Sequence, residues 1–229
     1  MSRTFWGVDI GATGTRIAQV TVEGRRAVME RLLKIPPEAD LAAALADSGL
    51  VVGDATLGLG GRDVMLRLLR VQEAPLPRLK MIMDFELAQI NAKSQEPLSG
   101  AYHICRSFAG SGGDLLALVA LVKDQTAETR IEHLRAAGCR VYRMLPGAVA
   151  VFNTFLALKR YEPSGTYLLV DVGAESTDVV LVRDLELVAA RTMSIGGALF
   201  TQSLADALGI SPADAEGLKR QRGVIKPKN

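Results

Sequence analysis

The sequence predicts an α/β protein of two lobes, with a smaller mixed α/β unit inserted between them. Two observations support this fold class. A strand, turn and strand segment occurs twice, and strands and helices alternate in the chain between the two copies. The chain has 229 residues, of which 48% are hydrophobic and 23% charged. This composition is ordinary for a globular protein with a sizeable core.

The repeated segment spans residues 8–16 and returns at residues 170–178. Aligned at a constant offset, six residue pairs are identical: Val8/Val170, Asp9/Asp171, Gly11/Gly173, Ala12/Ala174, Thr15/Thr177 and Val20/Val182. Internal similarity at a fixed offset indicates a duplicated structural unit. A single copy could be an ordinary hairpin with a glycine turn and an aspartate that bonds locally. The recurrence in register favours a shared function.

Each copy is expected to form a hairpin, with strands at residues 4–10 and 16–22 and at 167–172 and 178–182. Glycine in the turn permits positive φ and close approach of a ligand, and small hydroxyl residues leave several N–H groups directed at one space. Such a turn can hold phosphate oxygens. The expected phosphate-binding residues are Gly11, Ala12, Thr13, Gly14, Thr15, Gly173, Ala174, Ser176 and Thr177.

An aspartate ends the first strand of each copy, Asp9 in one and Asp171 in the other. A carboxylate repels phosphate, but it can hold a hydrated Mg²⁺ that neutralises phosphate, or it can polarise a water molecule. Two facing copies would therefore clamp the phosphate chain of a nucleotide between two lobes. We expect Asp9 and Asp171 to serve the metal, through water.

The chain around the first copy and between the copies has a regular order of predicted elements. A second glycine cluster, residues 58–61, predicts a turn rather than a phosphate loop, because no Lys-Ser/Thr pair follows it. The expected strands are 27–35, 55–59, 64–71, 101–108, 115–122 and 139–145, with a Gly/Ser turn at 110–113, and the expected helices are 41–46, 79–91 and 124–137. A further helix starts at Pro146 and runs to about residue 159, and the polar residues 160–166 predict a hinge.

The second copy is followed by a strand at 187–194 and then by two helices, at 198–208 and 212–222. Gly196 and Gly197 precede the first of these helices, and Ser211 is the expected N-cap of the second. Glu216 and Lys219 are three residues apart on that helix and share a face. Spacing alone predicts a surface ion pair.

Charge and residue usage exclude several classes of protein. The chain has 27 basic and 25 acidic residues, which gives no argument for nucleic-acid binding. The longest apolar run, residues 115–122, is far shorter than the ~20 residues of a membrane span. Cys105 and Cys139 fit no metal or redox spacing and predict buried thiols of a reducing compartment, the cytoplasm. His103 and His133 have no partner at ligand spacing.

The two copies resemble the phosphate motifs of the actin/Hsp70-like ATPases. Val8-Asp9-Ile10-Gly11 with Thr13 and Thr15 is similar to the first motif, and Val170-Asp171-Val172-Gly173 with Thr177 is similar to the second. The resemblance implies an actin-like (RNase H-like) ATPase fold. Its first lobe would comprise residues 1–60 and 144–163, its inserted subdomain residues 61–143, and its incomplete second lobe residues 164–229.

The segment from Gly196-Gly197 to Ala215-Glu216-Gly217-Leu218-Lys219 resembles the cell-division actin family FtsA and the type IV pilus assembly family PilM. The resemblance implies that Gly196, Gly197, Glu216 and Lys219 contact the nucleoside. Residues 60–67 and 74–77, followed by a helix with Glu86, resemble PilM more than FtsA. Membership of that family would imply a cytoplasmic adaptor that binds ATP and Mg²⁺. It would also capture an N-terminal peptide of a PilN-like inner-membrane partner beside the inserted subdomain.

Two departures from the family pattern bear on activity. Leu145 occupies the place of a Gln or Glu that orients the attacking water, which leaves Asp171 as the candidate for polarising water. The chain also ends at Lys226-Pro227-Lys228-Asn229 without a further glycine-rich adenine turn, so we expect a chain truncated within the second lobe, with a solvated tail.

Two other functions stay open. A small-molecule kinase on the same fold would need a base for the acceptor hydroxyl, and the inserted unit has no evident carboxylate motif for it. The other alternative is a scaffold that no longer binds nucleotide. Self-association and the extent of hydrolysis, at most that of a weak ATPase, also stay open.

Overall fold

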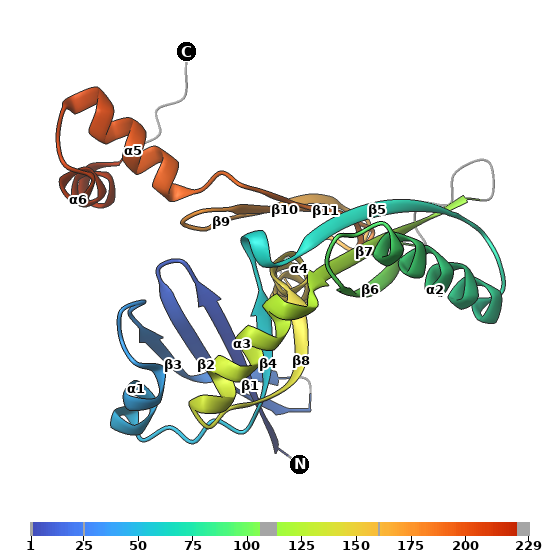
Figure 1. The fold of residues 1–229 in the computed structure, drawn as a ribbon, viewed down its shortest axis with the longest axis horizontal. Helices are drawn as coiled ribbons and strands as arrows, with labels where there is room; N and C mark the ends of the chain where they lie inside the picture. The colour runs from blue at the N-terminus through green and yellow to red at the C-terminus, as the bar shows by residue number, and fades with distance from the viewer. Residues whose placement is uncertain (1, 25, 106–113, 160, 224–229) are drawn as a thin grey trace.

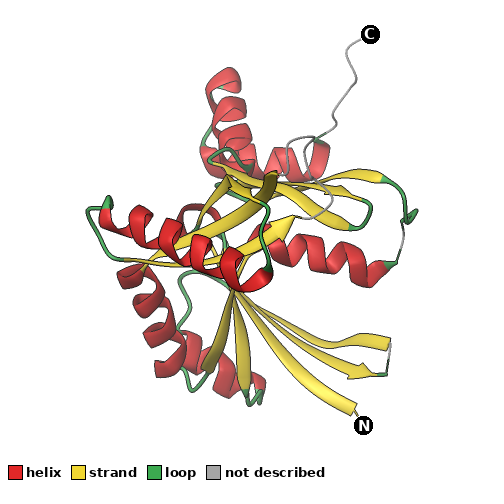
Figure 2. Ribbon diagram, turned by 90° about the vertical axis from the view of Figure 1, so that its right-hand side faces the viewer, coloured by secondary structure: helices red, strands yellow, loops and turns green. Residues whose placement is uncertain are grey.

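The computed structural model describes residues 2–24, 26–105, 114–159 and 161–223. Within them the strands form one five-stranded and two three-stranded sheets. Figure 1 shows the five-stranded sheet at one end of the molecule, the three-stranded sheets beyond it, and a helix pair near the C-terminus that projects to one side. The helices cover faces of the sheets and leave others open (Figure 2).

The five-stranded sheet has the order β3-β2-β1-β4-β8. Its strands are β1 (Ser2–Gly11), β2 (Gly14–Glu23), β3 (Arg26–Ile35), β4 (Asp54–Leu59) and β8 (Arg140–Pro146). The first three are antiparallel, whereas β4 runs parallel to both β1 and β8. Strand alternation places Val8 and Ile17 in the core beneath this sheet, where both are at most 2% exposed.

Two helices cover this sheet and complete its core. Helix α1 (Leu41–Ser48) begins where the Asp40 side chain accepts a hydrogen bond from the Ala43 N–H, and it buries Leu41 and Leu45. Helix α3 (Asp124–Ala136) adds Ala127 and Leu134 to the same core. The first lobe is thus a sheet with an apolar layer of helices on one face.

The second sheet, of order β5-β7-β6, carries helix α2. Its strands are β5 (Met65–Gln72), β6 (Leu98–Cys105) and β7 (Asp114–Lys123), all antiparallel, and a short 3₁₀ turn, η1 (Gly61–Asp63), precedes β5. Helix α2 (Leu76–Ala92) packs Leu79 and Met83 on the sheet. The prolines at positions 75 and 77 begin this helix earlier than the predicted residue 79, because proline fits a first helical turn.

Part of the predicted insert falls outside the described residues: the last three residues of the expected strand at 101–108 and the expected turn at 110–113. Cys105 and Cys139 are both buried, as the sequence predicts, and burial raises the pKa of each thiol. Buried thiols with a raised pKa are poor nucleophiles.

The third sheet, of order β11-β10-β9, belongs to the second copy of the repeat. Its strands are β9 (Thr166–Val172), β10 (Thr177–Arg183) and β11 (Glu186–Met193). Helix α4 (Gly147–Leu158) packs against it, and Val180, Val182 and Leu187 form the core between them. Two further helices follow, α5 (Gly197–Leu208) and α6 (Pro212–Arg222), with Ser211 capping the second as predicted.

The duplication seen in the sequence is also a duplication of strand register. In the first hairpin Asp9 pairs with Arg16 and Ile10 with Thr15. In the second hairpin Asp171 pairs with Asp178 and Val172 with Thr177. Equivalent residues therefore occupy equivalent ladder positions, so the two hairpins present the same positions on the same faces.

None of the helices among the described residues is both long and apolar enough to cross a membrane.

Candidate functional site: a cavity between the two hairpins

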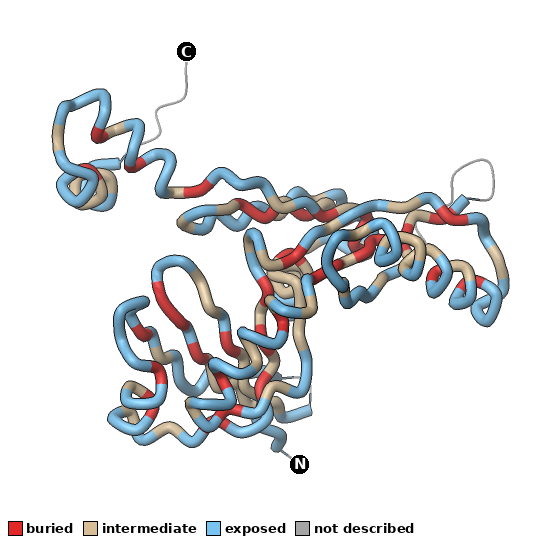
Figure 3. The backbone as a smooth tube through the Cα atoms, in the orientation of Figure 1, coloured by how far each residue is buried: buried red, intermediate tan, exposed pale blue. Residues whose placement is uncertain are grey.

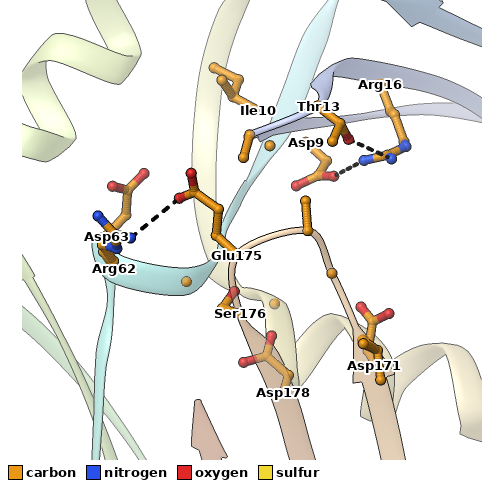
Figure 4. A pocket seen from close by; sticks show the side chains of 18 of the residues that line it. Asp9, Ile10, Thr13, Arg16, Arg62, Asp63, Asp171, Glu175, Ser176 and Asp178 are labelled. Atoms are coloured by element: carbon orange, nitrogen blue, oxygen red, sulfur yellow. Dashed lines mark hydrogen bonds and ion pairs between the residues drawn. The ribbon is translucent and has the colours of Figure 1, made fainter. Parts of the chain in front are cut away.

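The turns of the two repeated hairpins line one cavity of about 630 Å³. Figure 4 shows Asp9, Thr13 and Arg16 on one side of it and Asp171, Ser176 and Asp178 on the other. The first hairpin contributes Asp9, Ile10, Gly11, Ala12, Thr13 and Arg16, the second contributes Asp171, Val172, Gly173, Ala174, Glu175, Ser176 and Asp178, and a third wall contains Gly60, Gly61, Arg62, Asp63, Arg130 and Gly147.

The first wall is built on a two-residue loop, Ala12 and Thr13, between β1 and β2. Gly14 follows the loop with a φ of +120°, and a Cβ there would lie 2.2 Å from the carbonyl oxygen of Ile35. Only glycine fits this position, because both the backbone conformation and the contact with the end of β3 exclude a side chain. The loop is thereby held against β3, and both of its residues line the cavity.

Asp9 and Arg16 form a cross-strand ion pair in this wall. Arg16 Nη1 donates to Asp9 Oδ2 at 3.2 Å, and Arg16 Nη2 donates to Thr13 Oγ1 at 3.4 Å. Both side chains are about half exposed, so the pair contributes little to stability. The arginine therefore remains available to a phosphate group, for which a guanidinium is well suited.

The second wall is the four-residue turn Gly173 to Ser176, closed by a hydrogen bond from the Gly173 N–H to the Ser176 carbonyl at 2.8 Å. The first amides of α5, those of Gly197 and Ala198, donate to the carbonyls of Gly173 and Ala174. A Cβ on Gly196 would lie 2.5 Å from the Ala174 oxygen. This glycine thus allows α5 to begin directly against the turn.

Asp178 lies opposite Asp171 on β10 and is 8% exposed. Burial raises the pKa of Asp178 and the nearby charge of Asp171 raises it further, whereas a hydrogen bond from the Thr192 hydroxyl opposes the shift. The carboxylate also lies at the start of α4: a Cβ on Gly147 would come within 2.7 Å of Asp178 Oδ2.

The two hairpins therefore bring different charges to the cavity at equivalent positions. In the first, Arg16 faces Asp9 across the ladder and neutralises it. In the second, an aspartate takes the place of the arginine, so two carboxylates face each other. Like charges at a cross-strand pair are unfavourable. A bound cation or a retained proton would relieve the repulsion.

The third wall carries two arginines with acidic partners. Arg130 donates from Nε to Asp63 Oδ2 at 2.9 Å, in a partly buried pair that joins α3 to η1. Arg62 approaches Glu175 at 3.7 Å and so connects the third wall with the second. Figure 4 shows this contact at the side of the cavity.

Most of the residues predicted for the phosphate chain line this cavity, together with both predicted metal carboxylates, Asp9 and Asp171. Gly14, Thr15 and Thr177 do not line it. Thr15 and Thr177 are at most 9% exposed, and the Thr177 hydroxyl donates to the Ile195 carbonyl at 2.6 Å. These three residues contribute to the shape of the hairpin turns and do not line the cavity.

The residues predicted for the nucleoside lie next to the second wall. Lys219 Nζ contacts Glu216 Oε2 at 2.6 Å and donates to the Gly197 carbonyl at 3.0 Å. Hydrogen bonds from Lys219, Thr201 and Arg220 lower the pKa of Glu216 to about 2. The ion pair that spacing predicts is therefore present, and it joins α6 to the start of α5 rather than lining the cavity.

Several cavity residues escape the sequence reasoning. Arg16 and Asp178 could have been found from the pairing within each expected hairpin, because each lies directly across the ladder from a predicted aspartate. Arg62, Asp63 and Arg130 carry no local signal, because only the packing of η1 and α3 brings them to the cavity. The glycines at 60 and 61 form a turn, as predicted, but that turn lines the cavity.

The carboxylates fit a hydrated magnesium ion better than a fully protein-bound metal. Within the described part of the chain, no group of three or more His, Cys, Asp or Glu side chains could hold a metal ion. Magnesium keeps several of its waters and is bound through one or two carboxylates together with substrate phosphates. Asp9, Asp171 and Asp178 on the cavity walls meet that requirement.

Comparisons with known proteins agree with this architecture. The family described as cell division protein FtsA matches residues 168–229. No curated protein matches the sequence. Among solved structures, the PilM-PilN type IV pilus biogenesis complex superposes with a TM-score of 0.77 at 22% identity, covering 95% of this chain and 69% of that chain.

Two other structures are more distant. The cytoplasmic domain of EpsL, an inner-membrane component of the type II secretion system of Vibrio cholerae, gives a TM-score of 0.56 at 14% identity, covering 89% of this chain and 75% of that one. The ethanolamine utilization protein EutJ of Carboxydothermus hydrogenoformans gives 0.50 at 14% identity, covering 96% and 62%. The protein therefore has the actin-like ATPase fold that its duplicated hairpins predict, and within that fold it is similar to PilM.

Proposed function

We propose that the protein is an ATP-binding adaptor of an inner-membrane assembly complex, such as that of a type IV pilus, and that Mg²⁺·ATP occupies the cavity between the hairpins. One observation carries this proposal. Two hairpins with the same register line a single cavity and place an aspartate at the same position in each wall. Backbone turns on both sides suit a polyanion, and the carboxylates suit its metal.

In this proposal the turns after β1 and β9 bind the phosphate oxygens, and Arg16 adds a cation beside them. Asp9 and Asp171 hold Mg²⁺ through water, and Asp178 stands next to Asp171. The nucleoside extends along α5 toward Glu216 and Lys219. The contact between Lys219 and the Gly197 carbonyl supports that direction, because Gly197 is bonded to the phosphate turn. When bound, the metal would neutralise the phosphate chain.

Hydrolysis is expected to be slow. The residue before Pro146 is Leu145, whose side chain can neither donate nor accept a proton. Asp171 is the candidate for polarising water, and Asp178 is a second candidate because it is buried against the start of α4. Nucleotide would then act mainly by stabilising one arrangement of the two lobes over another.

The partner we propose is the N-terminal peptide of a PilN-like membrane protein, bound beside the inserted sheet. The similarity to the PilM-PilN complex supports it. Through this partner a cytoplasmic adaptor would reach the inner membrane. A pull-down with synthetic peptides from the N-termini of PilN-like proteins tests this part, and failure of all of them to bind would contradict it.

Calorimetry with ATP and Mg²⁺ tests the nucleotide site. We expect binding by the wild type and a loss of at least tenfold in affinity for Asp9→Ala, which removes one of the two metal carboxylates. Asp47→Ala changes an exposed carboxylate on α1 and is the matched control. Absence of binding by the wild type would favour the scaffold that has lost its nucleotide.

The two proposed functions, small-molecule kinase and adaptor, differ in whether a phosphorylated metabolite is formed from ATP. Incubation of the protein with labelled ATP and a panel of sugars, carboxylic acids and alcohols should give no phosphorylated metabolite above background. Turnover of any member of the panel well above background would contradict the adaptor proposal.

A further inference from the structure

Arg62 and Glu175 meet at the side of the cavity from different parts of the chain. Arg62 belongs to η1, which leads into β5 of the second sheet, and Glu175 belongs to the turn between β9 and β10. Arg62 Nη2 and Glu175 Oε2 are 3.7 Å apart, and the two side chains are 77% and 54% exposed. At that distance the contact is an ion pair without a hydrogen bond. The turns that carry the pair consist of exposed and half-buried residues (Figure 3).

Arg62 is the arginine of the cavity that is most easily released from its partner. Among the described residues, three arginines line the cavity, and each lies beside a carboxylate. Arg16 is hydrogen-bonded to Asp9 at 3.2 Å, and Arg130 is hydrogen-bonded to Asp63 at 2.9 Å in a partly buried pair. Arg62 has the longest contact and the most exposed side chain of the three. It therefore loses least when a ligand takes the place of its carboxylate.

The backbone beneath Arg62 is fixed, although its side chain is largely exposed. The next residue, Asp63, accepts a hydrogen bond from α3 at 2.9 Å, and Val64 is 6% exposed in the core of the first lobe. On the other side, a Cβ on Gly61 would lie 3.0 Å from Ser176 Oγ, so η1 lies close to the second wall. A ligand that binds Arg62 therefore needs to order only its side chain, which keeps the entropic cost of binding low.

Glu175 is an unusual residue for a turn that suits phosphate. At the constant offset of the repeat its counterpart is Thr13, whose hydroxyl can donate a hydrogen bond to a phosphate oxygen. A carboxylate repels the same oxygen. In the structure Arg62 partly neutralises the charge of Glu175. Glu175 and a bound phosphate would therefore compete for one guanidinium.

The position of Arg62 indicates which phosphate it would meet. The turn from Gly173 to Ser176 contacts α5 at one end, where the Gly173 and Ala174 carbonyls accept hydrogen bonds from the first amides of α5. The same turn contacts η1 at its other end, through Glu175 and Ser176. With the nucleoside on the α5 side, the phosphate chain would run along the turn, and its last phosphate would reach η1.

We propose that Arg62 recognises the terminal phosphate of ATP and makes the cavity select ATP over ADP, and that the phosphate displaces Glu175 from the guanidinium. The inference rests on the proposed occupation of the cavity by Mg²⁺·ATP. A guanidinium holds a phosphate through two parallel hydrogen bonds, which are stronger than its 3.7 Å contact with Glu175. ADP leaves this ion pair in place, because it has no group that reaches η1. Because η1 continues into β5, the terminal phosphate is also connected to the inserted sheet.

Calorimetry with Mg²⁺·ATP and with Mg²⁺·ADP tests this role of Arg62 in the full chain. We expect Arg62→Gln to weaken ATP binding at least fivefold and to change ADP binding less than twofold. Glu175→Gln removes the competing carboxylate and its repulsion of phosphate, so ATP binding should become at least twofold tighter. The matched controls are Arg78→Gln, at an exposed arginine on α2, and Glu73→Gln, at an exposed glutamate after β5. Both controls should leave the two affinities unchanged.

Equal losses of ATP and ADP affinity in Arg62→Gln would overturn the inference, and so would an unchanged ATP affinity in that variant. Weaker ATP binding by Glu175→Gln than by the wild type would also overturn it, because the carboxylate would then not compete with the phosphate. These results leave the proposed nucleotide site intact, since the wild type still binds. Absence of binding of both nucleotides by the wild type would instead overturn the proposed function and this inference together.

Discussion

Asp178 has surroundings unlike those of Arg16, its counterpart in the first hairpin. In the first hairpin Arg16 occupies the equivalent position and forms an ion pair with Asp9. Asp178 is instead buried opposite the carboxylate of Asp171. A buried carboxylate opposite a second carboxylate lowers the free energy of unfolding of the ligand-free protein. Groups that lower stability in this way are typical of binding and catalytic sites. The raised pKa of Asp178 is therefore consistent with a cavity built for a cation.

The pH dependence of stability follows from the direction of this shift. Because the folded-state pKa of Asp178 is raised above its ordinary value of 3.8, the folded protein binds the proton more tightly than the unfolded chain. The free energy of unfolding therefore falls as the pH rises from 3.8 through the raised value. We predict that Asp178→Asn, which removes the charge, increases the free energy of unfolding at pH 7 in the absence of ligand.

Urea denaturation of both proteins at several pH values checks this prediction. The difference between Asp178→Asn and the wild type should vanish below pH 3.8, where the aspartate is protonated in both states. The same variant should bind Mg²⁺·ATP more weakly. A variant less stable than the wild type at pH 7 would contradict the assignment of Asp178 as a buried, unfavourable charge.

Gly147 shows a second constraint at the residue scale. A Cβ there would lie 2.7 Å from Asp178 Oδ2, whereas a Cβ at Gly217 in α6 would meet nothing within 4 Å. We predict that Gly147→Ala lowers the free energy of unfolding by about 1–3 kcal/mol, as overpacking does. Gly217→Ala should raise it by about 0.5–1 kcal/mol, because alanine favours a helix interior. Equal effects of the two substitutions in urea denaturation would contradict the close contact.

At the scale of elements, α5 and α6 depend on polar contacts more than on an apolar core. Lys219, Thr201 and Arg220 all bond to Glu216, and Lys219 also reaches the carbonyl of Gly197 at the first turn of α5. Thr201, Ala205 and Ala215 are the buried residues of this pair of helices. Ion pairs at partly exposed sites hold little energy, so this unit is the part of the second lobe that a ligand can most easily reposition.

The Glu216 contacts give a prediction at this scale. The bond from Lys219 is the largest cause of the lowered pKa of Glu216, which is about 2. We predict that Lys219→Met raises this pKa toward the ordinary glutamate value of 4.5, and that the exposed Lys80→Met on α2 leaves it unchanged. Carboxylate NMR titration measures both. A Glu216 pKa still near 2 in Lys219→Met would show that the other two donors suffice.

At the scale of the whole molecule, the cavity lies between walls that belong to different sheets. One wall belongs to the five-stranded sheet, the opposite wall to the β9–β11 sheet, and Arg62 meets Glu175 between them. This exposed ion pair is too weak to fix the lobes. A ligand that contacts both walls would add a further connection between them, beside the core that α4 forms with the third sheet.

Ligand binding should therefore raise the unfolding temperature. A ligand at 100 times its Kd stabilises the folded state by about 2.7 kcal/mol, and for a chain of this size about 1 kcal/mol corresponds to roughly 2–4 °C. We predict a rise of about 5–10 °C with Mg²⁺·ATP at that concentration, measured by thermal unfolding. Asp171→Asn should lose most of the rise, and the exposed Asp47→Asn on α1 should keep it. No rise for the wild type would contradict nucleotide binding at this cavity.

The sequence alone determined the duplicated hairpins, the α/β class and most of the residues in the two turns. It could do so because strand alternation, glycine turns and repetition at a fixed offset are local properties that need no knowledge of packing. It also placed Asp9 and Asp171 at the strand ends that line the cavity. The last helix was predicted with the bounds that it has in the structure, residues 212–222. The Ser211 cap and the proline that follows it set the start of this helix.

Only the tertiary structure decided which other side chains reach the cavity and which apolar strand remains bare. Arg62, Asp63 and Arg130 come together because α3 packs against the first lobe beside η1. In this contact Asp63 pairs with Arg130, which lies 67 residues later in the chain. Val8 and Val170 are identical in a repeated motif, yet one is buried and the other half exposed. Burial depends on which strand and helix pack alongside, and that information lies in the rest of the chain rather than in the motif.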